Sequence, residues 1–164
     1  MTEVDLETIF PALEAQAAQL NEASDHANRV LGAIEKRLVD LNIGLEIWYP
    51  EPLDRAVSEG DLGPNETSSR VVQVLGFARV DGKWSLAVKP IRLVSGFFQG
   101  DMNCPFQNEY AAGPQTPLLK SSRGLRIAAL SAMPAFLVQL KKHVGSTIHD
   151  LNVATSKLQM ERTT

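Results

Sequence analysis

Residues 70–88 read RVVQVLGFARVDGKWSLAV, and the fold can be worked out from this stretch. Two runs of alternating residues flank Asp81-Gly82, a dipeptide preferred in two-residue type I′ turns. A turn at that point places Phe77 opposite Leu86 on one face of a hairpin. The same register pairs Val80 with Lys83, Arg79 with Trp84 and Leu75 with Val88. Because this face is large and apolar, we expect it to pack against helices.

The opposite face of the hairpin carries small or polar residues, and we expect it to be exposed or covered by a close-packed neighbour. Its members are Val74, Gly76, Ala78, Lys83, Ser85 and Ala87. Residues 44–49 (GLEIWY) also alternate and are followed by Pro50, which predicts a third strand. The predicted meander therefore has three strands, over 44–49, 70–80 and 83–95. The turn-rich stretches 50–69 and 99–121 are predicted to be loops, either functional or disordered.

Both ends of the chain carry apolar or small residues at alternating spacings of three and four, which indicates helices with one apolar stripe. The N-terminal stripe predicts one long helix over 8–42. The C-terminal stripe predicts helices over 122–133 and 134–160, because Pro134 interrupts helical hydrogen bonding. Its phase continues across Gly145, so the last helix should continue too. The predicted fold class is α+β: a long N-terminal helix, a three-stranded antiparallel β-meander, and C-terminal helices packing antiparallel on the first helix, all in one domain (1–164).

The two stripes are candidate interfaces of coiled-coil type. A helix of about 35 residues extends about 50 Å, longer than a small sheet can cover. Part of each stripe should therefore remain uncovered, and burying it favours a homodimer or a dedicated protein partner. A seam closed entirely within one chain is the alternative. The candidate seam residues are Leu13, Leu20, Leu31, Leu38, Leu140, Leu151 and Leu158.

Charge is divided unequally along the chain, although the net charge is only −3. Residues 1–69 hold fourteen acids and four bases, whereas residues 70–164 hold five acids and twelve bases. Opposite charge favours pairing of the two terminal helices with each other over pairing of either with its own copy. A basic half could also meet nucleic acid, but the acidic total disfavours that partner.

No catalytic, cofactor or metal motif is recognisable in the sequence. His143 and His149 are six residues apart, which places them on different faces of a helix, and Cys104 is the single cysteine. The glycines form neither a dinucleotide-binding nor a phosphate-loop pattern. We therefore predict no catalytic, cofactor-binding or metal-binding residues. An enzyme would have to use Cys104 as its nucleophile.

Ser122, Arg123 and Arg126 form the best candidate ligand site, because an anion can bind at a helix N-terminus beside two guanidinium groups. The hairpin adds basic residues next to Trp84, the combination found on single-strand nucleic-acid platforms. These basic residues are Arg70, Arg79, Lys83, Lys89 and Arg92. A regulatory binder of nucleic acid or of a small anionic ligand is therefore the alternative function.

The acidic start of the chain does not resemble a signal peptide, and no apolar run approaches the roughly 20 residues that cross a bilayer. A lone cysteine fits a reducing compartment. These features predict a protein of the bacterial cytoplasm that does not enter a membrane. The function best supported by the sequence is a non-catalytic protein–protein interaction or assembly module that uses the helical seams. Its expected partner is a second copy or another protein.

Overall fold

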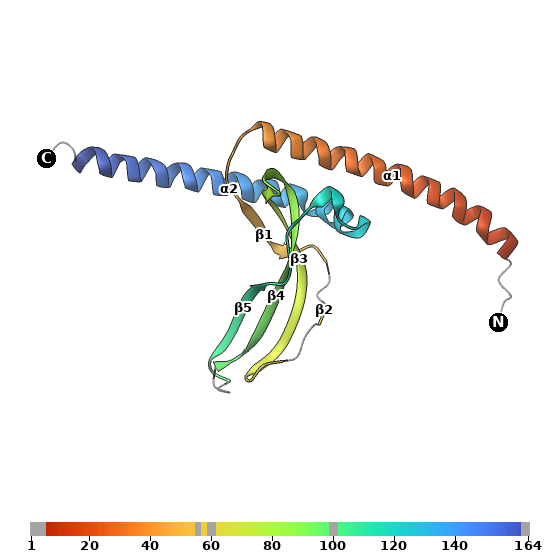
Figure 1. Ribbon diagram of the computed structural model, residues 1–164, viewed down its shortest axis with the longest axis horizontal. Coiled ribbons are helices and arrows are strands. Elements are labelled where there is room, and N and C mark those ends of the chain that lie inside the picture. The colour runs from red at the N-terminus through yellow and green to blue at the C-terminus, as the bar shows by residue number, and fades with distance from the viewer. Residues whose placement is uncertain (1–5, 55–56, 59–61, 99–101, 162–164) are drawn as a thin grey trace.

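The computed structural model describes residues 6–54, 57–58, 62–98 and 102–161. Two long helices, α1 (Leu6–Asp40) and α2 (Arg123–Glu161), project in opposite directions from a curved antiparallel sheet (Figure 1). The strands are β1 (Ile47–Pro52), β2 (Val57–Ser58), β3 (Glu66–Val80), β4 (Lys83–Phe97), β5 (Pro105–Ala111) and β6 (Thr116–Pro117), and a 3-10 helix, η2, spans Leu118–Lys120. The predicted α+β class is confirmed.

The β3–β4 hairpin forms the centre of the sheet. The strand order is β1-β3-β4-β5, with β2 on β3 and β6 on β4, and every pair is antiparallel. Phe77 pairs with Leu86 and Leu75 with Val88, so the predicted register is confirmed. Asp81 and Gly82 have φ angles of 50° and 80°, the positive values that a type I′ turn requires.

The prediction that 99–121 is a loop was wrong, because this stretch contains β5, β6 and η2. β5 pairs with β4 from Phe97–Pro105 to Ile91–Ala111. The meander therefore has four main strands rather than three. Almost all side chains of β5 are exposed, so the strand has no apolar alternation that sequence reasoning could detect. β3 also begins earlier than predicted, at Glu66, and β1 spans Ile47–Pro52 rather than 44–49.

The large apolar face of the hairpin meets both helices, as expected. Phe77 is buried and stacks on Trp84 with 5.4 Å between ring centroids. The buried residues of this core come from both long helices, from β1, β3 and β4, and from η2: Leu31, Leu38, Ile47, Leu75, Phe77, Leu86, Val88, Leu118, Ala129, Met133, Phe136 and Leu140. The sheet and the two helices therefore share one core, which fixes where each helix can leave the body.

The opposite face of the hairpin is not open where its residues are small. Val74, Ala78 and Ala87 are almost completely buried. The ring of Trp48, on β1, covers Gly76, and a Cβ at that position would overlap the ring. The Lys89 ammonium lies 4.0 Å from the centroid of the same ring, and burial lowers the pKa of Lys89. This covering buries the small residues of the face, while Arg79 and Lys83 stay exposed, and binding of nucleic acid stays a prediction.

α2 is one continuous helix, so the predicted break at Pro134 was wrong. A proline inside a helix removes one hydrogen bond and costs about 3 kcal/mol. The buried residues on either side keep their phase, because Ala129, Met133, Phe136 and Leu140 follow at spacings of four, three and four. Packing of this face on the core offsets the cost of the proline, which is itself exposed.

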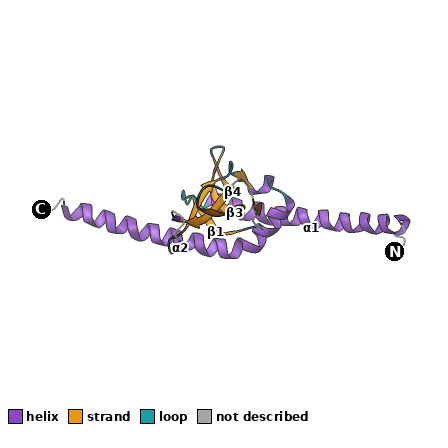
Figure 2. Cartoon of the chain, turned by 90° about the horizontal axis from the view of Figure 1, so that it is seen from below, coloured by secondary structure: helices purple, strands orange, loops and turns teal. Residues whose placement is uncertain are grey.

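The two helices lie side by side in the same direction, not antiparallel as predicted (Figure 2). At the start of α2, Arg123 donates a hydrogen bond to Asn21 of α1 at 2.9 Å. Further along α2, Leu137 lines one groove with Leu38, near the end of α1. The connection after β5 returns the chain to the middle of α1, where Leu119 packs beside Gly32. This return path, which the sequence pattern did not reveal, sets the parallel direction.

Candidate interaction surface

Each long helix is covered by its own chain over only part of its length. Residues 7–23 of α1 are all exposed, and residues 145–159 of α2 are exposed apart from half-buried Thr147. We call these segments the N-terminal arm (residues 7–23) and the C-terminal arm (residues 145–159). They leave the body at opposite ends (Figures 1 and 2). At 1.5 Å per residue they are about 25 Å and about 22 Å long.

The N-terminal arm continues the face by which α1 enters the core. Leu13 and Leu20 precede Leu31 and Leu38 by 18 residues each, which is five turns of a 3.6-residue helix. Leu31 and Leu38 are 0% and 6% exposed, whereas Leu13 and Leu20 are 50% and 49% exposed. The same face is thus core in one half of α1 and surface in the other.

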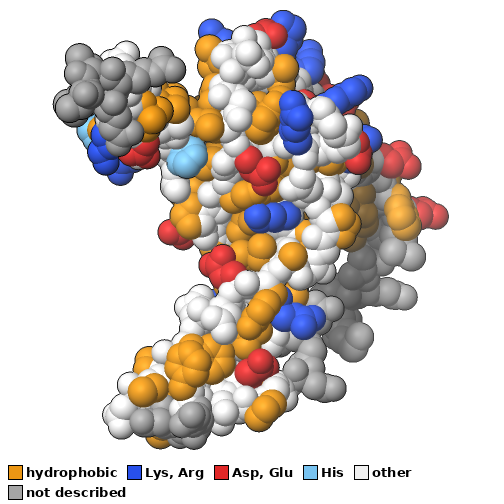
Figure 3. Space-filling view, turned by 60° about the vertical axis from the view of Figure 1, so that its left-hand side comes forward, with side chains coloured by type: hydrophobic (Ala, Val, Ile, Leu, Met, Phe, Trp, Pro, Cys, Tyr) orange, Lys and Arg blue, Asp and Glu red, His pale blue; other side chains and the backbone are white. Residues whose placement is uncertain are grey.

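The C-terminal arm repeats this relationship in α2. Leu151 and Leu158 follow Met133 and Leu140 by the same 18 residues. The two core residues are each 3% exposed, and the two leucines of the arm are 61% and 65% exposed. Figure 3 shows hydrophobic side chains on this arm, which projects at the upper left. Each arm therefore carries a core-like face that the described part of the chain leaves uncovered.

The seven predicted seam residues fall into two groups. Leu31, Leu38 and Leu140 pack in the core, and the other four lie on the arms: Leu13, Leu20, Leu151 and Leu158. The predicted seam residues did not include Ile148, which is 54% exposed. A strict alternation of three and four has a period of 3.5, whereas a straight helix has a period of 3.6, which places Ile148 beside Leu151 on the apolar face. Testing both periods would have found it.

The N-terminal arm is acidic, whereas the C-terminal arm, with Asp150 and Lys157, has no net charge and is preceded by Lys141 and Lys142. Between residues 7 and 28 the chain has four acids and no lysine or arginine: Glu7, Glu14, Glu22 and Asp25. Between residues 141 and 159 it has three lysines, Lys141, Lys142 and Lys157, and one acid, Asp150. The charge division seen in the sequence is therefore carried onto the two projecting helices.

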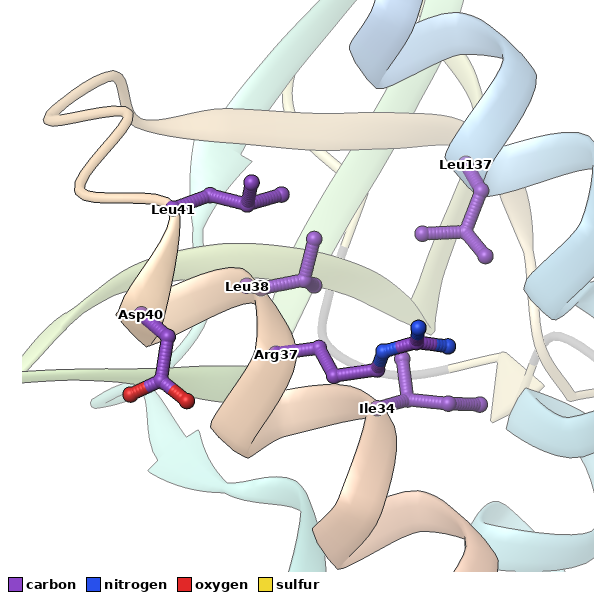
Figure 4. A pocket seen from close by; sticks show the side chains of 6 residues that line it. All are labelled: Ile34, Arg37, Leu38, Asp40, Leu41 and Leu137. Carbon is purple, nitrogen blue, oxygen red and sulfur yellow. The ribbon is translucent and has the colours of Figure 1, made fainter.

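An apolar groove lies where α1 ends beside α2 (Figure 4). Leu137 points from α2 toward Leu38 and Ile34 of α1, and Arg37 and Asp40 add charged groups to the lining. Leu41 extends the rim and is 67% exposed. The groove adjoins the part of α2 that leads into the C-terminal arm, so the apolar surface continues from body to arm.

Glu35 ties the covered half of α1 to the sheet. The backbone N–H of Leu86 donates a hydrogen bond to the Glu35 carboxylate at 2.8 Å. Burial raises the pKa of Glu35 above its ordinary value of 4.5, and the hydrogen bond from Leu86 opposes that rise. This contact holds α1 in place on β4 and so fixes the direction in which the N-terminal arm projects.

The predicted anion site has its side chains engaged within the chain. Ser122 caps α2 by accepting a hydrogen bond from the N–H of Leu125 at 3.3 Å. Arg123 donates to Asn21, and Arg126 donates to the carbonyl oxygen of Leu119 at 3.1 Å. Anion binding at Ser122, Arg123 and Arg126 stays a prediction. Their observed hydrogen bonds position the start of α2 beside α1.

Other chemistry is sparse in the described residues. They include no group of three or more His, Cys, Asp and Glu side chains that could hold a metal ion. Cys104 is exposed in the turn before β5, away from both arms. Among the helices of the described ranges, none combines the length and apolar character needed to span a membrane.

Comparisons with protein-family models, with curated proteins and with solved structures found no match. Among the described residues, the two arms combine a core-like apolar face with projection from the body.

Proposed function

We propose that this protein is a non-catalytic assembly module that binds protein partners through its two projecting arms. The observation that carries the proposal is the five-turn relationship within each helix. Leu13 and Leu20 occupy the face that Leu31 and Leu38 use to enter the core, yet half of each side chain stays exposed. A face of core type continues past the body, where the described part of the chain places nothing on it.

Physical chemistry supports a partner for such arms. Most helical stability in proteins comes from packing of the apolar face. The arms lack that packing within the described chain, and an exposed apolar patch on a projecting element is typical of an interaction site. Covering the arms with a partner would bury the exposed leucines and stabilise both helical ends.

Photo-crosslinking in the cells that make the protein tests this proposal. A benzophenone amino acid is placed at Leu13 or at Leu151, one position on each arm. Matched controls carry the same probe at Gln19 and at Val153, on the opposite faces of the same arms. The expected result is a crosslinked protein band of defined mass from the two leucine positions, at least several-fold stronger than from the controls.

The same experiment can refute the proposal. Equal crosslinking from the leucine and control positions would mean that the apolar faces of the arms have no dedicated partner. The identity of the crosslinked protein, read by mass spectrometry, then separates a second copy from a different protein. Either identity supports an assembly module.

A further inference from the structure

Resting on that proposed function, we propose that the partner of each arm is the opposite arm of a second copy. In this arrangement α1 of one chain lies parallel to α2 of the next, and copies join head to tail. The N-terminal arm of one copy and the C-terminal arm of its neighbour then continue the seam that α1 and α2 form within each chain. Four features of the arms support this choice of occupant and orientation.

Three exposed apolar residues on each arm have the same spacing. Phe10, Leu13 and Leu20 on the N-terminal arm correspond to Ile148, Leu151 and Leu158 on the C-terminal arm, while Ile9 and Val153 are also exposed and have no large apolar counterpart. Both sets therefore have intervals of three and then seven residues. Two helices that run in the same direction bring all three pairs level with one another. Antiparallel helices reverse one series to seven and three, so that all three pairs cannot be level.

The body of the molecule also favours the parallel direction. In an antiparallel pair, the partner's α2 would continue from the N-terminal arm along the apolar face of α1 toward Leu31 and Leu38. That part of the face is already packed in the core with Met133 and Leu140 of the same chain. In a parallel pair the partner's body lies beyond the start of α1, where the arms project into open space (Figure 1).

The ends of the helices fit the parallel alignment. Pairing Leu20 with Leu158 of the next copy brings residue 159, the end of that copy's C-terminal arm, level with Asn21. Asn21 accepts the hydrogen bond from Arg123, at the start of this chain's own α2. The apolar face of α1 would thus be covered first by the neighbour's C-terminal arm and then, within one turn, by its own α2. The lengths of the arms, about 25 Å and about 22 Å, agree with this division.

Charge favours the opposite arm over an identical one. Glu7, Glu14 and Glu22 would repel their counterparts on a second N-terminal arm, whereas the C-terminal arm, with Asp150 and Lys157, has no net charge and adds no such repulsion. Because the paired surfaces are different, the contact is heterologous, and repetition gives a ring or an open chain of copies. The sheets would be carried along the outside of a continuous two-helix seam.

Two half-blocked variants test the arrangement. One carries Leu13→Asp and Leu20→Asp, which block the N-terminal arm, and the other carries Leu151→Asp and Leu158→Asp, which block the C-terminal arm. All four positions are exposed, so the fold should be retained, and circular dichroism checks this. Matched controls place the same number of charges on the opposite faces, as Ala15→Asp with Gln19→Asp and as Val153→Asp with Ser156→Asp.

Light scattering coupled to size exclusion gives the mass over a hundredfold range of protein concentration. We expect the mass of the wild type and of both controls to rise beyond a dimer with concentration, and each half-blocked variant alone to stay a monomer. An equimolar mixture of the two variants should form a dimer that grows no further, because it has one intact arm of each kind.

The contrary results are distinct. Dimers formed by one half-blocked variant alone would mean that like arms pair, and a wild type that stops at a dimer would mean a closed two-fold contact. Both outcomes overturn the head-to-tail arrangement. A wild type that stays a monomer, while the arms crosslink to a different protein in cells, overturns self-pairing and leaves the proposed assembly function standing. A monomer whose arms crosslink to nothing refutes both.

Discussion

Replacing Leu13 and Leu31 separately by alanine makes the same chemical change at two points of one helical face. Leu31 is 0% exposed and lies in the shared core. Truncation of a buried leucine costs about 2–5 kcal/mol, so Leu31→Ala should lower the free energy of unfolding by that amount. Leu13 is 50% exposed. For the dilute monomer, Leu13→Ala should change the free energy of unfolding by no more than about 0.5 kcal/mol.

For self-association, Leu13→Ala should have the larger effect and Leu31→Ala the smaller one. Complete burial of a leucine side chain contributes about 1.5–3 kcal/mol. Because half of Leu13 is already covered, its burial in a contact between copies should contribute about half of that, or about 0.8–1.5 kcal/mol. Leu13→Ala should therefore raise the Kd of that contact about 4- to 12-fold, since each 1.4 kcal/mol is a factor of ten. Leu31→Ala should leave the Kd nearly unchanged wherever the variant stays folded.

Urea denaturation at concentrations below the Kd measures the first quantity, and sedimentation equilibrium measures the second. A further variant, Gln19→Ala on the opposite face of the N-terminal arm, controls for a general effect of alanine on the helix. If Leu13→Ala destabilises the dilute monomer as much as Leu31→Ala does, the N-terminal arm packs within its own chain and the reasoning from the arms is wrong.

Three further predictions concern the body of the molecule and the stability of the C-terminal arm. Because burial raises the pKa of Glu35, the native state binds the proton of this carboxyl group more tightly than the unfolded state does. The protonated group therefore adds to the free energy of unfolding at low pH, and this contribution is lost as pH rises above 4.5. Glu35→Gln should remove that part of the pH dependence in urea titrations, while its amide oxygen still accepts the hydrogen bond from Leu86. Identical pH profiles for the wild type and the variant would contradict this. Gly76→Ala should cost about 1–3 kcal/mol because the new Cβ overlaps the Trp48 ring, and it should cost much less in a chain that carries Trp48→Ala. Gly145→Ala, where nothing lies within 4 Å of the added Cβ, should stabilise the C-terminal arm by about 0.5–1 kcal/mol, and weaker amide-exchange protection of that arm would speak against it.

The elements that the sequence pattern predicted well are those with strong local signals. The Asp81-Gly82 turn and its flanking alternation led to the observed pairing of Phe77 with Leu86. β5 was missed because its side chains are almost all exposed and its pairing with β4 is made by the backbone. Pro134 suggested a break because a local rule was applied without the packing of Met133 and Phe136 that holds the helix together.

The candidate site shows the same division between local and tertiary information. The stripes that contain Leu13 and Leu151 are visible in the sequence, and so is the opposite charge of the two helices. Periodicity does not tell a core face from a surface face, because Leu13 and Leu31 are identical in residue type and in helical phase. The tertiary structure distinguishes the two halves of α1, because Leu31 is buried in the shared core and Leu13 lies at the surface.

By itself the sequence determined which faces are apolar, where the central hairpin turns and how charge is shared between the two ends, because these properties depend on neighbours within about one helical turn or one strand pair. Tertiary structure alone decided that α1 and α2 run in the same direction and that their uncovered ends point to opposite sides. The reason is that the connection after β5 returns the chain beside Asn21 before α2 begins, and the shared core has room for only half of each helix.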